Sequence, residues 1–134
     1  MEILKSEQYV IFRPENVDFD TILASQIEKS IAGMYSAEGR INFIIDLSIV
    51  KEFTMAGILL FNKVQKICKN ESGLLVLVST DENIIDTIST HAEDFLLILP
   101  SQEEAIDAVF MNELENDFKD EHDDEYGTDG ESDY

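Results

Sequence analysis

Short β-rich apolar segments alternate along this chain with longer segments in which apolar residues recur every three or four positions. The first pattern is typical of strands, and the second places apolar side chains on one face of a helix. Strands that alternate with helices favour a largely parallel sheet, because parallel neighbours need a long crossover connection. The pattern predicts strands at 2–5, 9–12, 41–47, 74–78 and 95–99, and helices from 21 to near 39, at 55–69, from 80 or 81 to near 91, and from 101 to about 118.

The predicted fold class is α/β, with a mixed sheet of four to five strands packed with four helices. The first two strands are separated by three residues and are expected to form a hairpin. Segment 41–47 is almost wholly apolar, as expected of a strand in the middle of the sheet. Asp18 or Asp20 is placed to cap the first helix, and Ser101 with Glu104 forms a capping-box pattern at the start of the last one.

The charge of the chain is strongly negative, with 29 acidic residues against 9 Lys and Arg and a net charge of −20. Such a chain is repelled by phosphate backbones and by anionic membrane surfaces, so nucleic acid is not expected as a partner. Half of the net charge lies in residues 113–134. We predict a folded domain over residues 1–118 and a disordered acidic tail over residues 119–134, because the tail has too few apolar residues to offset the entropy of ordering.

Neither a targeting segment nor a membrane span is expected. The longest apolar runs, such as 74–78, are far shorter than the roughly 20 residues needed to cross a bilayer, and the N-terminus lacks the pattern of a signal peptide. A single cysteine, Cys68, cannot form an internal disulfide. These features predict a cytoplasmic protein that is not embedded in a membrane.

The inventory of reactive groups predicts that the chain is not an enzyme. The sequence has no glycine-rich phosphate loop, no nucleophile motif and no zinc-binding histidine motif. Cys68 lies on the apolar stripe of its helix, so we interpret it as a small buried hydrophobe. His91 falls near a helix C-terminus, where an imidazole meets the helix dipole, and His122 lies in the tail. We expect no cofactor and no metal.

A series of weak motifs, in order and at the right spacing, resembles the STAS domain family. Segment 44–58, which reads IIDLSIVKEFTMAGI, resembles the middle of such a domain, where a strand ending in v-D-l-s leads to D-S-S-G at the start of a helix. Segment 74–78 resembles the buried strand that follows, and segment 101–105 resembles the start of the family's last helix. The resemblance covers about residues 1–112 and implies a STAS-like arrangement of the predicted sheet and helices.

The resemblance further implies a non-enzymatic protein that docks a partner through the N-terminus of the second helix and the adjacent loops. In the family, the first serine of D-S-S-G is often phosphorylated, and in this chain Thr54, Met55 and Ala56 take the places of Asp, Ser and Ser. Either the switch has been lost and the domain binds its partner constitutively, or the phosphorylation site has moved to Thr54, whose other interpretation is a helix N-cap. The residues implied to bind the partner are Asn16, Asp18, Asp20, Thr54, Met55, Ala56, Gly57, Ile58 and Asn62.

Three functions remain open from the sequence. The first is an anti-sigma-factor-antagonist-like protein, a monomer or weak dimer, that binds an anti-sigma factor or a kinase-like regulator. The second is a STAS-type accessory subunit of a membrane transport complex that binds its cytoplasmic ATPase. The third, a small nucleotide-binding or hydrolytic protein, lacks a phosphate loop. Met55, Ile58 and Leu59 lie off the apolar stripe of their helix, so they belong either to a docking surface or to the core.

Overall fold

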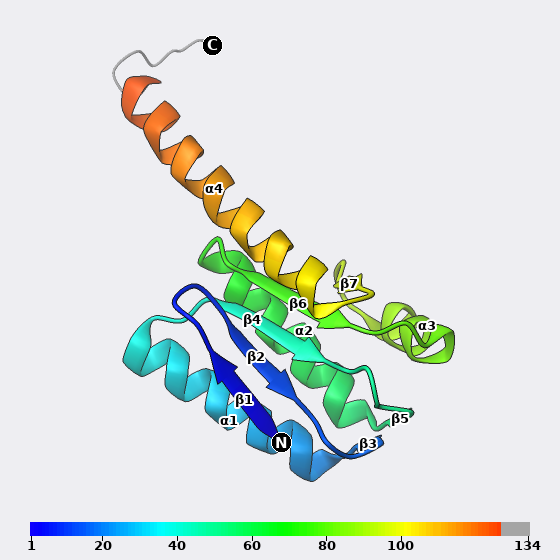
Figure 1. The fold of residues 1–134 in the computed structure, drawn as a ribbon. Coiled ribbons are helices and arrows are strands. Elements are labelled where there is room, and N and C mark those ends of the chain that lie inside the picture. The colour runs from blue at the N-terminus through cyan, green and yellow to red at the C-terminus, as the bar shows by residue number, and fades with distance from the viewer. Residues whose placement is uncertain (127–134) are drawn as a thin grey trace.

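A computed structural model describes the backbone of residues 1–126 and the side chains of residues 1–118. Figure 1 shows a twisted sheet with helices on both faces. The elements follow one another in the order β1 (Glu2–Lys5), β2 (Val10–Arg13), β3 (Asp18–Phe19), α1 (Thr21–Glu38), β4 (Asn42–Asp46), β5 (Glu52–Phe53), α2 (Met55–Asn70), β6 (Leu74–Val78), α3 (Glu82–His91), β7 (Leu97–Leu99) and α4 (Gln102–Tyr126).

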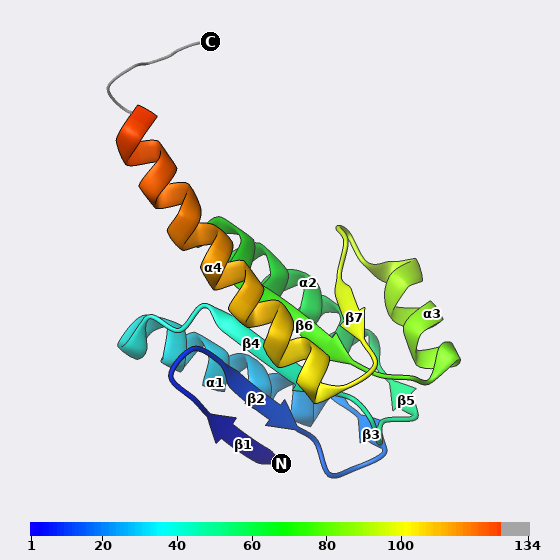
Figure 2. The ribbon, with the colours of Figure 1, turned by 45° about the horizontal axis from the view of Figure 1, so that its top comes forward.

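The main sheet has five strands in the order β1-β2-β4-β6-β7. The β1–β2 hairpin is antiparallel, and every other neighbouring pair is parallel, so the predicted mixed sheet, its hairpin and its central strand β4 are confirmed. The three crossovers, from β2 to β4, from β4 to β6 and from β6 to β7, each place the next strand on the same side of the previous one. Because crossovers of this kind are right-handed, α1, α2 and α3 all lie on one face and α4 alone lies on the other (Figures 1 and 2).

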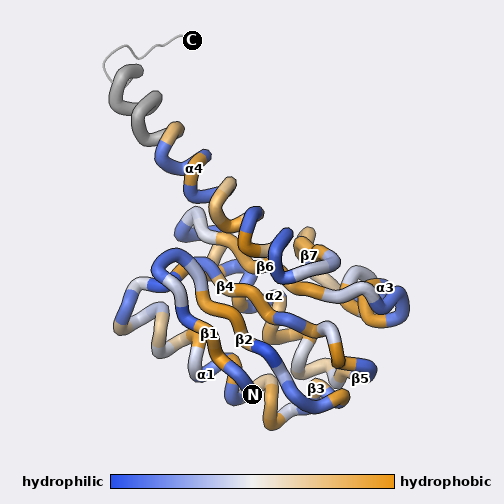
Figure 3. The backbone as a smooth tube through the Cα atoms, viewed as in Figure 1, coloured by the Kyte–Doolittle hydropathy of each residue, from blue (hydrophilic) through white to orange (hydrophobic). Residues whose placement is uncertain are grey.

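The two faces of the sheet have cores of different size. The larger core lies between the sheet and α1, α2 and α3, and includes Phe43 and Ile45 of β4. The smaller core lies against α4 and includes Ile44 of β4 together with Ala105 and Val109 of α4. Successive side chains of a strand point to opposite faces, so a strand covered on both faces carries consecutive apolar residues, as β6 and the middle of β4, residues 43–45, do (Figure 3).

The helix ends follow the capping signals of the sequence. Asp20 caps α1, and its side chain accepts a hydrogen bond from the Leu23 N–H at 2.9 Å. Gly39 ends α1 in the left-handed conformation, with φ of 69°, which favours glycine. Ser101 precedes α4, and its hydroxyl oxygen accepts from the Glu104 N–H at 3.2 Å. The predicted starts of α1, α2 and α4 are therefore confirmed.

Two elements differ from the sequence-based expectation. The last strand is shorter than predicted, because β7 begins at Leu97 and Phe95 lies outside it with 73% of its surface exposed. The last helix is longer, since α4 continues to Tyr126 rather than ending near Phe118. The first part of the predicted tail is thus helical, and residues 127–134 lie outside the described residues. No helix in the part of the chain described is both long and apolar enough to cross a membrane.

A two-stranded ribbon that the sequence did not predict lies beside the main sheet. It pairs β3 with β5 in parallel, with Asp18 opposite Glu52 and Phe19 opposite Phe53. Each strand has two residues, too few for the period-two pattern that identifies a strand. The ribbon determines where α1 and α2 begin, and it is the basis of the candidate site.

Candidate docking surface

The β3–β5 ribbon brings the N-termini of α1 and α2 side by side. One residue separates β3 from α1 and one separates β5 from α2, so Asp20 and Thr54 occupy equivalent positions at the two helix starts. The Thr54 N–H donates to the Phe19 carbonyl at 3.2 Å, and this bond ties the start of α2 to the strand that leads into α1. Both helices start at the end of the sheet where its parallel strands terminate (Figures 1 and 2).

Gly57 allows the ribbon to pack directly against the first turn of α2. Phe19, Phe53 and Phe61 form an aromatic cluster beneath that turn, with ring centroids 5.2 to 5.6 Å apart. A Cβ atom on Gly57 would lie 2.8 Å from a Phe19 ring carbon and 3.0 Å from a Phe53 ring carbon. Since real Cβ atoms essentially never approach other atoms so closely, the glycine is required by packing, and Gly57 itself is buried.

Thr54 occupies the N-cap position of α2, although its hydroxyl does not cap the helix. Within the described residues its side chain makes no cap hydrogen bond, and the hydroxyl donates instead to the Phe19 carbonyl at 3.5 Å. The expectation that the Thr54 hydroxyl accepts a backbone N–H of the helix is therefore wrong. The Gly57 N–H of this first turn donates to the Thr54 carbonyl at 3.1 Å, not to the hydroxyl, and Thr54 is exposed.

Met55 and Leu59 form the outward face of the first two turns of α2. They are one helical turn apart, and their exposed fractions are 53% and 59%. At the same end of the molecule, Val17 precedes the ribbon and Ile22 lies in the first turn of α1 with 70% of its surface exposed. We name Val17, Ile22, Met55 and Leu59 the helix-start surface. Large exposed apolar side chains near one another are typical of protein interaction sites.

Three of the predicted site residues lie in the interior rather than on this surface. Ile58 is 2% exposed and belongs to the core, so its expected place in a docking surface is wrong. Gly57 is buried as well. Asn62 is 7% exposed, and its carbonyl oxygen accepts from the Glu93 N–H at 3.1 Å, which fastens the loop after α3 to α2. Ala56 is half-buried and packs against the larger core.

The remaining predicted residues give the helix-start surface an acidic border. Asn16, Asp18 and Asp20 are all exposed, as is Glu52, which is paired with Asp18 in the ribbon. Lys51, next to Glu52 of the ribbon, forms an ion pair with Asp81 at 3.4 Å. The pKa of Asp81 lies below its ordinary value of 3.8, first because the Ile84 backbone N–H donates to this carboxylate and further because of Lys51. The surface thus favours a partner with basic groups around an apolar contact.

Sequence reasoning identified Met55 on this surface and missed Val17 and Ile22. The missing signal was the ribbon, since only the pairing of β3 with β5 brings these residues beside α2. Leu59 was named with Met55 as lying off the apolar stripe, in either a docking surface or the core, and its exposed fraction of 59% places it on the surface.

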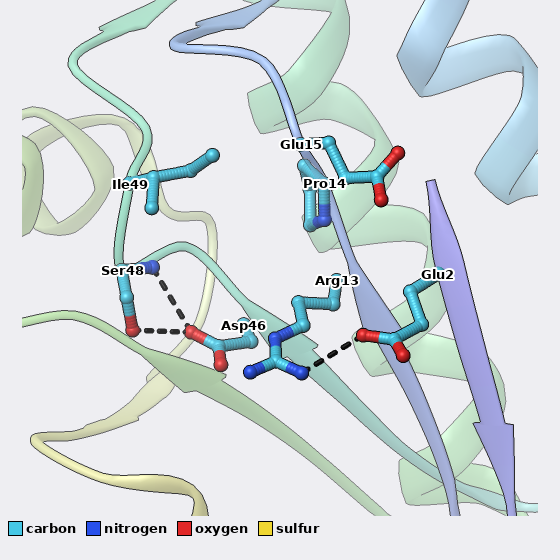
Figure 4. Close-up of a pocket in the computed structure, with 7 residues that line it drawn as sticks. All are labelled: Glu2, Arg13, Pro14, Glu15, Asp46, Ser48 and Ile49. Carbon is cyan, nitrogen blue, oxygen red and sulfur yellow. Dashed lines mark hydrogen bonds and ion pairs between the residues drawn. The ribbon is translucent and has the colours of Figure 1, made fainter.

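A hollow of about 420 Å³ lies at the same end of the sheet (Figure 4). Its floor holds Asp46, whose carboxylate accepts hydrogen bonds from the Ser48 N–H at 3.0 Å, from the Ser48 hydroxyl and from the Gln102 side-chain amide at 2.6 Å. Arg13 reaches into the hollow and donates to Glu2 at 2.8 Å. Asp46 and Arg13 thus both have hydrogen-bond partners within the protein. The bonds of Asp46 to Ser48 and Gln102 hold the turn after β4 and the start of α4 in place.

Two side chains of reactive type, Cys68 and His91, make structural contacts. Cys68 lies in the larger core, where burial raises the pKa of its thiol to about 12, so the thiol stays protonated and unreactive at neutral pH. His91 lies in the last turn of α3, and its Nδ1 donates to the Thr87 carbonyl at 2.9 Å. Among the described side chains, no group of three or more His, Cys, Asp or Glu is arranged to hold a metal ion.

Solved structures share this arrangement of sheet and helices. A protein of Thermotoga maritima assigned as an anti-sigma factor antagonist matches with a TM-score of 0.69 and 19% identity, over 81% of this chain and 92% of its own. The chain has the STAS fold. SpoIIAA, an anti-sigma factor antagonist, matches in its unphosphorylated form with a TM-score of 0.64 and 15% identity, over 81% of this chain and 96% of its own. SpoIIAA is also known in a phosphorylated form.

The STAS fold also occurs as one part of a larger membrane protein. The murine anion transporter Slc26a9 matches over 81% of this chain and 18% of its own, with a TM-score of 0.60 and 16% identity. No protein-family model matches the sequence, and no curated protein matches it by sequence comparison. The likeness therefore concerns the fold, which is found both in free-standing regulators and in a transporter.

Proposed function

We propose that this STAS-fold chain is a non-catalytic regulatory protein that binds a partner protein through the helix-start surface. The observation that carries the proposal is the outward position of Met55 and Leu59, half or more exposed, on a helix whose other apolar residues are largely buried. Methionine suits a docking surface because its flexible side chain adapts to different partners. The similarity to anti-sigma factor antagonists supports the same reading.

The acidic border indicates the chemistry of the partner. Asp18, Asp20 and Glu52 surround the apolar side chains, so a complementary partner presents Lys or Arg around an apolar contact. An anti-sigma factor or a kinase-like regulator with such a surface is the partner we propose. The acidic border also opposes nucleic acid at this site.

Thr54 is the residue that we propose as a phosphorylation site on this surface. It is exposed, and it is the one residue with a hydroxyl group in segment 53–58. A phosphoryl group there would lie at the N-terminus of α2, where unpaired N–H groups and the helix dipole favour negative charge. Thr54→Glu is expected to change partner affinity, and Thr54→Val, which removes the hydroxyl, is expected to retain binding and abolish phosphorylation by the cognate kinase.

The test of the docking proposal is capture of partners by the tagged full-length chain from the cytoplasm of its source cell, followed by mass spectrometry. Met55→Glu with Leu59→Glu is expected to abolish recovery of the partner and to leave the melting temperature nearly unchanged. Met111→Glu is the matched control, because Met111 is similarly exposed, at 58%, on the other side of the sheet. Equal recovery by both variants would exclude the helix-start surface as the docking site.

We propose a second function, that of an accessory subunit in a membrane transport complex. Such a subunit binds the cytoplasmic ATPase of that complex. It is favoured by the presence of the fold in an anion transporter and by Met55, which offers no hydroxyl for phosphorylation. The same capture distinguishes the two functions. Recovery of a transporter ATPase or permease supports the accessory subunit, and recovery of an anti-sigma factor or kinase-like regulator supports the antagonist.

The domain boundary is also a proposal, namely a folded domain of residues 1–118 that is stable without residues 119–134. Asn116 near the end of this domain donates to the Ser72 carbonyl at 2.8 Å and still holds α4 to the body. In urea, the free energy of unfolding of a chain truncated after Phe118 is expected to lie within about 0.5 kcal/mol of that of the full chain. A much larger loss would show that the tail contributes to the fold.

A further inference from the structure

The last helix, α4, carries large apolar side chains on the side that faces away from the protein. In Figures 1 and 2, α4 lies across one face of the sheet, and none of the described elements lies on its far side. Met111, Leu114 and Phe118 are 58%, 62% and 60% exposed. The solvent side of a surface helix normally carries polar residues. The outward side of α4 is therefore a candidate interaction surface.

Contacts of α4 with the rest of the protein fix which of its sides faces outward. Val109 is fully buried against the sheet, and Asn116, seven positions later, donates to the Ser72 carbonyl at 2.8 Å. Residues seven apart lie on the same side of a helix, because they are separated by almost two turns. Met111 follows Val109 by two positions, and Phe118 follows Asn116 by two. Two positions are a rotation of about 200° around a helix, so both side chains point away from the sheet.

The outward apolar residues of α4 have the spacing of a helix–helix seam. Met111, Leu114 and Phe118 follow at intervals of three and four, so they take the a, d and a positions of a heptad. We name these three residues the α4 seam. Glu115 and Asp117 fall at the e and g positions that flank the seam, and both are exposed. Side chains at a and d positions pack against a second helix, so the spacing indicates a helix as the occupant.

The charges beside the α4 seam specify a basic occupant. Segment 113–126 has eight acidic residues against one lysine. Side chains at e and g positions set the choice of partner through salt bridges, so Glu115 and Asp117 favour Lys or Arg on the facing helix. A second copy of this chain would bring the same acids together, and the acids also oppose an anionic membrane. Residues 127–134 have no large aliphatic side chain to place on the seam.

A hollow of about 450 Å³ borders the α4 seam on the side of the turn between α2 and β6. Its lining includes Lys69, Ser72, Glu115 and Phe118. Lys69 already forms an ion pair with Asp94 at 2.7 Å, whereas Glu115 forms no ion pair within the described part of the chain. A lysine or arginine on a helix that lies along the seam therefore has room to reach the Glu115 carboxylate.

We propose that a helix of a partner protein, with an apolar stripe flanked by Lys or Arg, packs lengthwise against the α4 seam. Its apolar side chains cover Met111, Leu114 and Phe118, and its basic side chains pair with Glu115 and Asp117. The seam is about 11 Å long, so the contact is small and suits a reversible association. The proposal does not depend on the helix-start surface, which lies on the other side of the sheet. Met111→Glu is accordingly expected to retain the partner of the helix-start surface and to lose the partner of the seam.

The test uses the full chain and two synthetic helical peptides with the same leucine stripe. One peptide has lysines at its e and g positions, and the other has glutamates there. Calorimetry is expected to show saturable binding of the lysine peptide and none of the glutamate peptide. Backbone amide spectra are expected to place the bound peptide at residues 111–118. Failure of the lysine peptide to bind, or binding mapped to Met55 and Leu59, would overturn the proposal.

Two matched double variants separate the α4 seam from general attraction to an acidic protein. Met111→Ser with Leu114→Ser is expected to weaken binding of the lysine peptide by at least about tenfold. Met55→Ser with Leu59→Ser removes the same two residue types at similar exposed fractions, 53% and 59%, and is expected to leave the affinity unchanged. Equal weakening by both pairs overturns the proposal. If the α4 pair alters the unfolding curve, Leu114→Ser alone carries the test, because Leu114 is the more exposed of the two.

Charge reversal tests the positions that flank the α4 seam. Glu115→Lys with Asp117→Lys is expected to weaken the lysine peptide and to allow the glutamate peptide to bind. Glu82→Lys with Asp86→Lys changes the net charge by the same amount at exposed positions of α3, and it is expected to keep the preference for the lysine peptide. The same preference in both variants overturns the proposal. A dimer in sedimentation that Leu114→Ser dissociates overturns it in favour of a second copy.

Discussion

The side-chain amide of Gln102 donates a hydrogen bond to the carboxylate of Asp46 at 2.6 Å, across 56 positions of sequence. Asp46 is the last residue of the central strand β4, and Gln102 is the first residue of α4. The bond therefore joins the middle of the sheet to the start of the one helix that covers its second face. Ser48 also donates to Asp46, so a single carboxylate organises both the turn after β4 and the origin of α4.

Removing this carboxylate is expected to destabilise the fold. Asp46→Ala leaves the Ser48 N–H and the Gln102 amide without their acceptor, and we expect a loss of about 1–3 kcal/mol in the free energy of unfolding. Urea unfolding measures the loss. The control is Asp86→Ala, at an exposed position of α3, which is expected to change stability by less than about 0.5 kcal/mol. Similar values for both variants would show that the Asp46 bonds contribute little.

Two glycines on neighbouring helices are expected to respond in opposite directions to alanine. Gly57→Ala places a methyl group against the rings of Phe19 and Phe53, and overpacking of this kind costs about 1–3 kcal/mol. Gly33 in α1 has nothing within 4 Å of the added Cβ, so Gly33→Ala is expected to stabilise by about 0.4–1 kcal/mol. Thermal unfolding of both variants checks the pair. A stabilising Gly57→Ala would show that the aromatic cluster moves aside at little cost.

The two adjacent helix caps are expected to differ in strength. Asp20→Ala removes a side chain that accepts from the Leu23 N–H and is expected to cost about 1 kcal/mol. Thr54→Ala removes no cap bond, so its loss in the free energy of unfolding is expected to be only a few tenths of the loss for Asp20→Ala. Thr54→Asp introduces a better capping side chain at an extended N-cap residue and is expected to stabilise α2. Urea unfolding compares the three, and equal losses for the two alanine variants would contradict the assignment of the caps.

The contribution of Asp81 is expected to depend on pH with a definite sign. Its pKa is lower in the folded chain than the ordinary 3.8, because the Ile84 and Asn83 N–H groups and Lys51 favour the ionised carboxylate. The stabilisation is thus complete above the ordinary pKa and is lost as the pH falls through the lowered one. Asp81→Ala is expected to be less stable than the parent at about pH 6, and the difference is expected to shrink toward about pH 3.

Unfolding curves across this range test the Asp81 prediction. Thr80→Ala, which removes an exposed neighbour without an ionisable group, is the control and is expected to give a constant difference. A difference for Asp81→Ala that grows as the pH falls would reverse the sign of the assigned pKa change.

Local periodicity was enough to predict most of the fold. The buried strand β6 and the middle of β4, residues 43–45, form continuous apolar runs, and α1, α2 and α4 begin at capping or boundary residues visible in the sequence. The end of α4 was less visible, because apolar spacing stops at Phe118 while the helix continues to Tyr126. Helix formation by charged residues leaves no hydrophobic pattern to detect.

The candidate site was only partly predictable, because it depends on contacts between distant segments. Met55 was identified from a resemblance centred on segment 44–58, yet burial separated it from Ile58, three positions away. That separation is set by the rotation of α2, which in turn depends on the packing of Phe19 and Phe53 against Gly57. Val17 and Ile22 join the surface through the β3–β5 pairing, which no two-residue segment reveals on its own.

The position of α4 on its own face of the sheet has a consequence for synthesis of the chain. The ribosome makes α1, α2, α3 and the strands of the sheet before α4, so the residues of the larger core are all translated before the helix that covers the second face. On the other face, Ile44, Val76 and Val78 become buried only when Ala105 and Val109 of α4 pack on them, and these two are among the last core residues translated. A chain that ends near Pro100 therefore lacks the helix that buries this face, and its exposed apolar sheet is prone to aggregation.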